Sequence, residues 1–431
     1  MKRLITCAGL AAVGVATMDA QPVGEPSVSK PWSVSAKVRG FYDDNYNTAP
    51  SNPTPGYPYQ KAESWGFSVA PSIGANLLRD QTTLGVRYDF DLRWYEARKN
   101  DNLDMYHSAS LKLAHQFSER YRIELHDNFV YSDEPSVAFG SAAAPAVFVR
   151  TEGNNLRNYG GIGFNGSFTE HWGYRLGYEN TYYNYSQDGD GSRSALLDRI
   201  ENKVTVDFRR LIQPTTTALV GYSFEDVDHT ADSYLIVPAY APGVPLSNIP
   251  MSDFRNSRNH FGFLGLDHDF TTQLNAQLRA GVEYGDFYNA GENYTVPYAD
   301  ATLGYKYAEG SQIQLGIKHG LSATDIAVDY NLSGVTLAAE STTLYAGLSH
   351  RITSKLTATV RGQWSMMDYR STGVGYGGQT DNYYSADVSL IYTLNQYLAF
   401  DAGYLFDRLD SDVPNRTFDR NRAYLGIRAT Y

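Results

Sequence analysis

Residues 64–95 read SWGFSVAPSIGANLLRDQTTLGVRYDFDLRWY and decide the fold class. Between positions 64 and 77 every second residue is apolar or small, and these residues are Trp65, Phe67, Val69, Ile73, Ala75 and Leu77. Between positions 83 and 95 the alternating apolar residues are Leu84, Val86, Tyr88, Phe90, Leu92 and Trp94. Alternation with a period of two predicts β-strands that have one apolar and one polar face. The polar stretch Leu78–Thr82 between them predicts a tight hairpin turn.

The same unit of two alternating strands and a short turn repeats along the chain. Eight such turns are predicted, at Leu78–Thr82, Phe117–Tyr121, Phe168–Trp172, Arg210–Pro214, Phe270–Leu274, Tyr307–Ser311, Ile352–Leu356 and Leu394–Leu398. Longer stretches rich in Pro, Gly, Asn, Asp and Ser separate them, at 47–61, 135–154, 186–194, 230–256 and 372–381. Short turns at one rim and long loops at the other are typical of outer-membrane barrels. With one further strand at either end, the hairpins predict an all-β, transmembrane, antiparallel up-and-down β-barrel of about 18 strands, with 16 as the alternative.

The length of the strands supports a membrane barrel. Each strand covers about 11 to 15 residues, longer than the ~5 to 6 of globular strands and sufficient to cross a bilayer at a tilt. Aromatic residues gather where strands meet turns, at Trp32, Phe117, Tyr121, Phe168, Trp172, Tyr307 and Tyr397. They predict an interfacial girdle; the alternative is that Tyr simply fits strands well. We therefore expect short periplasmic turns, long extracellular loops and an outer-membrane location in a Gram-negative bacterium.

The N-terminus has the features of an export signal. Lys2 and Arg3 precede an apolar stretch from Leu4 to Val15, which predicts a cleaved signal peptide over residues 1–20, with Ala16 as an alternative cleavage point. Residues 21–31 are then a short periplasmic segment, and residues 32–431 form the barrel. The single cysteine, Cys7, lies inside the signal, so we expect no disulfide and no thiolate chemistry in the mature chain.

Charge and motifs restrict the classes of function. The formal net charge of −11 disfavours a nucleic-acid partner, which needs a basic face. No Gly-rich phosphate cradle or catalytic histidine motif is present among the nine histidines, so no cofactor, metal or catalytic residue is predicted. His115 and His350 fall on outward faces beside short turns, where they would meet lipid headgroups. The segment 187–192 has the Asp-x-Asp-Gly appearance of a calcium loop, but it lacks the downstream Glu of an EF-hand, and a plain turn is the preferred interpretation.

Both ends of the predicted barrel carry a signature. The chain ends in an amphipathic strand in which Leu425, Ile427 and Tyr431 share one face, which resembles the C-terminal signal read by the barrel-assembly machinery. At the other end, residues 38–45 read VRGFYDDN and resemble the opening strand of the putative β-barrel porin 2 family of outer-membrane proteins. This resemblance implies a porin-like barrel and defines no substrate.

Inward-facing charges are the candidate functional residues. The proposed lumen lining is Lys37, Arg39, Arg87, Asp89, Asp91, Arg93, Arg122, Glu124, Arg175, Glu201, Lys203, Asp207, Arg209, Arg361, Asp387 and Arg422. His126, Glu179, Arg279, Glu283, Asp401, Asp407, Arg420 and Arg428 are expected on the same face. Interleaved cations and anions across a pore set its ion preference. Alternatively, these charges pair across neighbouring strands and simply fill a wet interior.

The resulting functional prediction is a porin-like channel for passive diffusion of small hydrophilic solutes or ions. The apolar loop 230–256 could fold into the pore as a constriction, bind a partner, or pack on neighbouring loops. Two alternatives stay open: a non-conducting structural or adhesive barrel that acts through its loops, and a rim enzyme. The expected partners are outer-membrane lipid and lipopolysaccharide, the assembly machinery during folding, and small solutes or ions; nothing in the sequence marks an oligomer interface.

Overall fold

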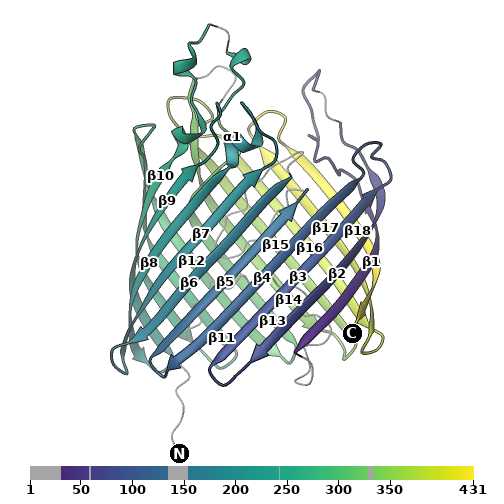
Figure 1. Cartoon of the computed structure of the whole chain (residues 1–431), viewed down its shortest axis with the longest axis vertical. Helices are drawn as coiled ribbons and strands as arrows, with labels where there is room; N and C mark the ends of the chain where they lie inside the picture. The colour runs from purple at the N-terminus through teal and green to yellow at the C-terminus, as the bar shows by residue number, and fades with distance from the viewer. Residues whose placement is uncertain (1–30, 58–59, 134–153, 242, 329–332) are drawn as a thin grey trace, which may run out of the picture.

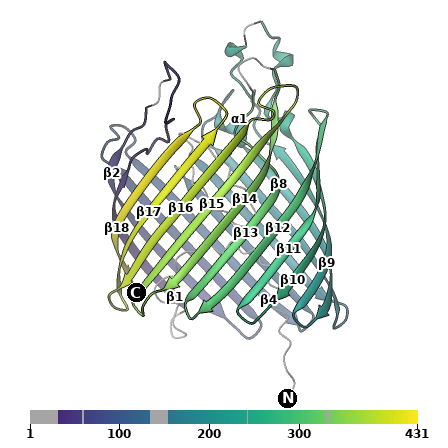
Figure 2. The same cartoon turned by 180° about the vertical axis from the view of Figure 1, so that it is seen from behind.

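The computed structural model describes residues 31–57, 60–133, 154–241, 243–328 and 333–431, so the predicted signal peptide lies outside the described residues. Eighteen strands form one antiparallel sheet (Figures 1 and 2). Their bounds are β1 Trp32–Asp43, β2 Ser64–Leu78, β3 Thr82–Tyr95, β4 Leu103–Ser118, β5 Tyr121–Ser132, β6 Asn155–Ser167, β7 Trp172–Tyr185, β8 Arg199–Gln213, β9 Thr216–His229, β10 Ser257–Asp269, β11 Leu274–Phe287, β12 Glu292–Ala308, β13 Ser311–Ser322, β14 Thr336–Arg351, β15 Leu356–Ser371, β16 Thr380–Thr393, β17 Leu398–Ser411 and β18 Phe418–Thr430.

The sheet closes into a barrel, because β1 pairs with both β2 and β18 and each strand from β2 to β17 pairs with its two sequence neighbours. The prediction of about 18 strands is thereby confirmed. Closure leaves no unpaired sheet edge, which is the condition for a sheet to lie in lipid. In the described parts of the chain, no helix has the length and apolar character needed to cross a membrane.

The alternation read from the sequence orients each strand. In β2, Trp65 is 67% exposed and Ile73 is 53% exposed, whereas Ser64 and Ser68 are 2% and 5% exposed. The inner side chains are crowded by the curvature of the wall, and the outer ones have nothing over them. Apolar residues therefore form the outer face, and small or charged residues face the lumen, as the period of two requires.

The eight hairpins lie at one rim (Figure 1), where the C-terminal strand also ends. One predicted turn is misplaced: β8 continues to Gln213, so this turn consists of Pro214 and Thr215 rather than Arg210–Pro214. A register shift between Leu211 and Gln213 accommodates the extra strand residues, and Pro214 suits the first central position of a tight turn. The opposite rim is also not uniformly long, since residues 288–291 alone join β11 to β12.

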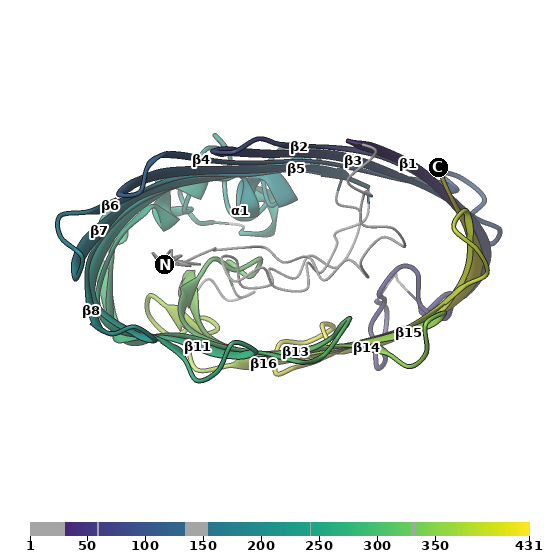
Figure 3. The same ribbon diagram turned by 90° about the horizontal axis from the view of Figure 1, so that it is seen from below.

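Three connections at the extracellular rim contribute structure to the end of the barrel. The first contains the helix α1 Arg193–Leu197, and the second contains the 3₁₀ turns η1 Pro238–Tyr240, η2 Leu246–Asn248 and η3 Ser252–Arg255. The third joins β13 to β14 through residues 323–335. Seen along the axis, the barrel is flattened and α1 lies within its outline (Figure 3). The lumen is therefore partly filled from its extracellular end.

The closing contact between β1 and β18 is reinforced by the motif Tyr42-Asp43-Asp44-Asn45. Asp43 is fully buried, and its two carboxylate oxygens share the Arg420 Nε–H of β18, each at 3.0 Å. Asp44 accepts the Asn421 backbone N–H at 2.6 Å, and Asn45 donates to the Asp419 carbonyl at 2.8 Å. We call the Asp43–Arg420 pair the seam pair. The motif behind the family resemblance thus joins the first strand to the last.

Candidate functional site

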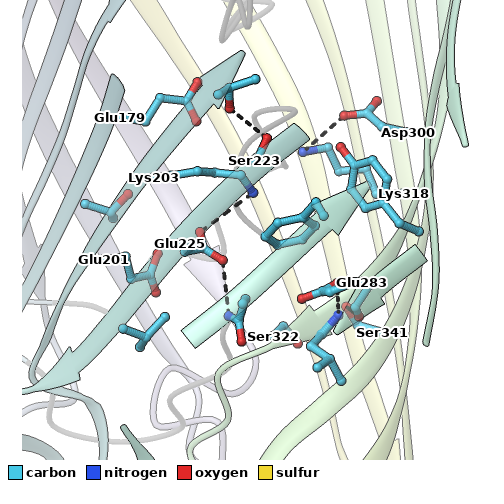
Figure 4. A pocket seen from close by; sticks show the side chains of 18 of the residues that line it. Glu179, Glu201, Lys203, Ser223, Glu225, Glu283, Asp300, Lys318, Ser322 and Ser341 are labelled. Carbon is cyan, nitrogen blue, oxygen red and sulfur yellow. Dashed lines mark hydrogen bonds and ion pairs between the residues drawn. The ribbon is translucent and has the colours of Figure 1, made fainter. Parts of the chain in front are cut away.

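One cavity in the lumen, which we call the lumen pocket, has a volume of about 350 Å³ and is lined mainly by side chains of β6 to β14 (Figure 4). This volume lies at the lower end of the ~300 to 1,000 Å³ typical of small-molecule sites. Five of the predicted lining residues meet in it: Arg175, Glu201, Lys203, Asp207 and Arg209.

The lumen pocket carries charges of both signs on facing walls. Its cations are Arg175, Arg199, Lys203, Arg209, Arg255, Arg279 and Lys318. Its carboxylates are Glu179, Glu201, Asp207, Glu225, Glu283 and Asp300. The formal charges nearly cancel and leave one excess cation. A passing solute would meet donors on some strands and acceptors on others, which is the arrangement expected of a polar filter.

Two lysines project into the lumen pocket without tight pairing (Figure 4). The Lys203 Nζ lies 3.8 Å from Glu225 and 3.7 Å from the ring centre of Phe261, and the Lys318 Nζ lies 3.8 Å from Asp300. Both N–O separations are longer than those of a good hydrogen bond, so each ammonium is balanced by a nearby carboxylate without a short contact. These two groups are the best placed to contact an anion or a carboxylate in the pocket.

One carboxylate of the lumen pocket has a hydrogen-bond partner on only one of its two oxygens. Glu283 is 1% exposed, and its Oε2 accepts the Leu321 backbone N–H at 2.9 Å. Its Oε1 has no partner among the described residues. A buried acceptor of this kind is costly unless water or a solute occupies the space beside it. The pocket therefore presents an acceptor as well as donors.

Six other predicted lining residues lie on β3 and β5 and pair within their own strand. The pairs are Arg87–Asp89 at 2.7 Å, Arg93–Asp91 at 3.0 Å and Arg122–Glu124 at 2.9 Å. Residues i and i+2 of a strand share a face, which explains why each Arg finds its acid two positions away. These side chains form a second polar surface, outside the lumen pocket.

The last five predicted lining residues lie on β1, β15, β16 and β18: Lys37, Arg39, Arg361, Asp387 and Arg422. Arg39 pairs with Asp401 across an intervening strand, since Gly426 of β18 lies between them. A Cβ on Gly426 would come within 2.5 Å of the Arg39 Cγ, so only glycine permits this contact. Arg361 and Asp387 are cross-strand partners at 3.8 Å. Pairing along and across strands therefore accounts for much of the lumen charge.

The extracellular end of the lumen is covered where three loops interlock. Arg255 of η3 is 1% exposed and donates to the carbonyl of Leu196 in α1 at 3.0 Å and to that of Thr324. Burial and the nearby charge of Arg199 lower the pKa of Arg255 to about 10. Leu235 packs with Ala327 and Leu337 in a shared apolar cluster. Part of the loop 230–256 thus packs on neighbouring loops, one of the three outcomes expected for it.

Segment 323–328 is tied down at its far side by an ion-pair cluster that we call the loop anchor: Asp325, Asp381 and Arg416. Arg416 donates to both Asp325 oxygens at 2.8 and 3.0 Å, and to Asp381 at 2.9 and 3.1 Å. Tyr369 donates to the same Asp381 oxygen. Burial alone would lower the pKa of Arg416, but Asp325 and the other acidic groups raise it well above its usual value. Arg416 is therefore charged and holds two buried carboxylates together.

Sequence reasoning missed several of these residues. Glu225, Asp300 and Lys318 lie within strands, so the same period of two could have identified them. Asp325 and Arg416 lie in irregular loops that carry no periodic signal. Only the path of the chain brings these two residues, 91 positions apart, into contact.

The predicted C-terminal assembly residues lie on the outer wall. Leu425, Ile427 and Tyr431 are at least half exposed, and the Tyr431 ring lies 5.9 Å from that of Trp32. Their recognition during assembly stays a prediction.

Part of the chain matches a known protein family. The family model described as Putative beta-barrel porin 2 matches residues 333–431, which contain β14 to β18. This confirms, over those residues, the family that the sequence resembles. No curated protein sequence matches the chain.

Several solved outer-membrane proteins have a similar chain course at low identity. The outer membrane protein opdK from Pseudomonas aeruginosa is 10% identical with a TM-score of 0.41, covering 93% of this chain and 99% of that one. A BenF-like porin from Pseudomonas fluorescens Pf-5 is 11% identical with a TM-score of 0.44 over the same shares. OccAB3 from Acinetobacter baumannii is 12% identical with a TM-score of 0.42, again over 93% and 99%.

A closed barrel with an apolar outer face is the architecture of Gram-negative outer-membrane proteins. The chain is such an 18-stranded outer-membrane barrel, and its last five strands match the family Putative beta-barrel porin 2.

Proposed function

We propose that this protein is a channel for passive diffusion of small hydrophilic solutes or ions, and that the lumen pocket is its filter. The observation that carries the proposal is the facing array of both charge signs in a lumen cavity. An 18-stranded barrel has the circumference of known aqueous channels. The covering loops narrow the lumen at its extracellular end. The polar wall of β6 to β14 is then the surface along which a solute would pass.

Single-channel recording of the purified protein in a planar bilayer tests this function. Stable open steps under two salt gradients would give the conductance and the ion preference. A folded, heat-modifiable barrel that never conducts would contradict the channel.

The second candidate is a non-conducting barrel that acts through its extracellular loops. The specific observation in its favour is the interlocking of residues 193–197, 252–255 and 323–328 over the lumen. A rigid loop platform suits contact with a partner. Conductance separates the two candidates.

The two lysines of the lumen pocket predict the sign of the ion preference. Changing Lys203→Gln and Lys318→Gln removes two positive charges while keeping side-chain length, so the pocket becomes net negative. We expect the reversal potential in a KCl gradient to shift towards cations, by severalfold in the permeability ratio, because local charge sets the ion concentration in a narrow lumen. The control is Arg408→Gln, which removes a positive charge from the exposed Arg408–Asp410 pair outside the pocket. An equal shift in both variants would contradict a filter at the pocket.

A further inference from the structure

The outer wall contains a duplicated arrangement of histidines. Residues 107–117 read HSASLKLAHQF on β4, and residues 260–270 read HFGFLGLDHDF along β10 and the following turn. In each strand two outward histidines stand eight positions apart with two leucines between them. Because side chains alternate with a period of two, two histidines eight positions apart lie on the same face of their strand. Each strand therefore has one histidine near each rim of the barrel.

The lower histidine of each strand is bonded to the same partner in the same register. His115 lies opposite Thr82, the first residue of β3, and His268 lies opposite Thr216, the first residue of β9. The threonine hydroxyl is 2.7 Å from the His115 Nδ1 and 2.8 Å from the His268 Nδ1. Two strand pairs, β3–β4 and β9–β10, with four strands between them, thus repeat one side-chain geometry.

These lower histidines lie at the edge of the apolar wall. Eight residues span ~27 Å along a strand, or ~20 Å along the membrane normal at a usual tilt, close to the ~25 Å height of a barrel's apolar band. Phe117 and Phe270 follow beside the short turns, each 56% exposed. Their rings meet those of His115 and His268 edge-on, at 4.6 and 4.4 Å between centres. Both histidines therefore lie at the periplasmic interface, between hydrocarbon and water.

The hydrogen bond at Nδ1 determines what the other ring nitrogen can do. With the threonine donating to Nδ1, the Nε2 carries the proton, and it keeps that proton if the ring becomes charged. In the parts of the chain that the structure describes, neither the His115 Nε2 nor the His268 Nε2 has a hydrogen-bond partner. In this tautomer each ring is an oriented Nε2–H donor on the outer wall.

The upper histidines have different surroundings. His107 lies 4.8 to 6.2 Å from three rings, those of Tyr88, Phe90 and Tyr131. His260 is placed in the same way among Tyr222, Phe224 and Tyr284. These rings belong to aromatic clusters, whereas each lower histidine meets a single aromatic ring. The Nδ1 atoms of His107 and His260 are also bonded to hydroxyls, those of Tyr88 and Tyr222 at 2.8 and 2.7 Å, so the two pairs differ in their aromatic surroundings and in the rim that they approach.

We propose that His115 and His268 bind the phosphate groups of phospholipids in the periplasmic leaflet. The Nε2–H donates to a phosphate oxygen, the adjacent Phe contacts the glycerol and acyl region, and the threonine fixes the ring in plane. The phosphate is the anionic acceptor found at this depth, which matches a donor that can also carry positive charge. This inference concerns the outer wall and does not depend on conduction through the lumen.

The test is thermal unfolding of the detergent-solubilised barrel with two short-chain lipids, dihexanoyl phosphatidylglycerol and a dihexanoyl glycolipid that lacks phosphate. A ligand that binds the folded state raises the apparent Tm. We expect the phosphate-bearing lipid to raise the Tm of the unaltered protein more than the glycolipid does. The double change His115→Phe and His268→Phe should remove that difference, because it keeps the aromatic contact and deletes the donor.

The matched control is His107→Phe with His260→Phe, which should leave the difference intact. If the unaltered protein responds equally to both lipids, or if the lower double variant keeps the full difference, the inference is wrong. Loss of the difference in the control alone would also overturn it. Should the lower double variant fail to fold, Thr82→Val with Thr216→Val keeps both imidazole rings and removes the hydroxyls that orient them. If this variant keeps the full difference in Tm shift between the two lipids, the oriented donor is contradicted.

Discussion

Arg416→Ala is expected to increase the single-channel conductance, because it releases segment 323–328 from the lumen. The change leaves Asp325 and Asp381 buried without their shared cation. Removing one partner of a buried ion pair costs about 3–5 kcal/mol. At 1.4 kcal/mol per tenfold, the ratio of anchored to released loop falls by roughly two to three and a half orders of magnitude. A population change of that size should produce a new, larger open state.

Arg408→Ala is the control for this experiment, since Arg408 is half exposed and pairs with Asp410 on the same strand. It should leave the conductance unchanged. A second readout does not need an open channel. The sequence has one cysteine, Cys7, so in a Cys7→Ser background a Thr324→Cys reporter can be labelled selectively. Thr324 is 4% exposed, and its labelling should accelerate when Arg416→Ala is added. Unchanged labelling and conductance together would show that the anchor does not hold the loop.

Asp43→Ala should destabilise the closed barrel by about 3–5 kcal/mol, the second large effect expected. Asp43 is fully buried and is ion-paired with the Arg420 guanidinium, which is 5% exposed, so the change removes one partner of a buried pair between β1 and β18. The free energy of unfolding in guanidinium chloride, measured in lipid vesicles, is the appropriate quantity.

Lys61→Ala provides the comparison for the seam pair. Lys61 bridges Asp44 at 3.1 Å and Asp419 at 2.8 Å near the same strands, but it is more than one-third exposed. Exposed pairs contribute about 0.2–1 kcal/mol, so this variant should lose little stability. Similar losses in the two variants would mean that burial of the seam pair is unimportant.

The fold followed from the sequence because a membrane barrel has few degrees of freedom. Once alternation placed Trp65 and Ile73 outside, the strand direction, the turn positions and the even strand count followed. The misplaced turn after β8 shows the limit of this reasoning. Leu211 and Ile212 are compatible with the end of a strand and with the start of a turn. The register shift that extends β8 depends on the pairing of β8 with β9, which the local sequence does not reveal.

The site was only partly predictable. Alternation identified inward residues such as Lys203 and Arg209, but it contains no information on which strands face one another across a flattened lumen. Gly426 illustrates the same point, since its absent side chain allows Arg39 to reach Asp401. The loop anchor was not predicted from the sequence, because Asp325 and Arg416 are brought together by tertiary packing alone.

The seam pair also bears on the order of events in folding. Asp43 and Arg420 are 377 positions apart and belong to the pairing of the first strand with the last, which is the most non-local strand pairing in the barrel. Contacts between distant parts of a chain form late, because most of the intervening chain must already be arranged. Pairing of these two residues thus reports that all eighteen strands are in place. A chain interrupted before β18 would keep an open sheet edge at β1, where the carboxylate of Asp43 would be exposed to solvent.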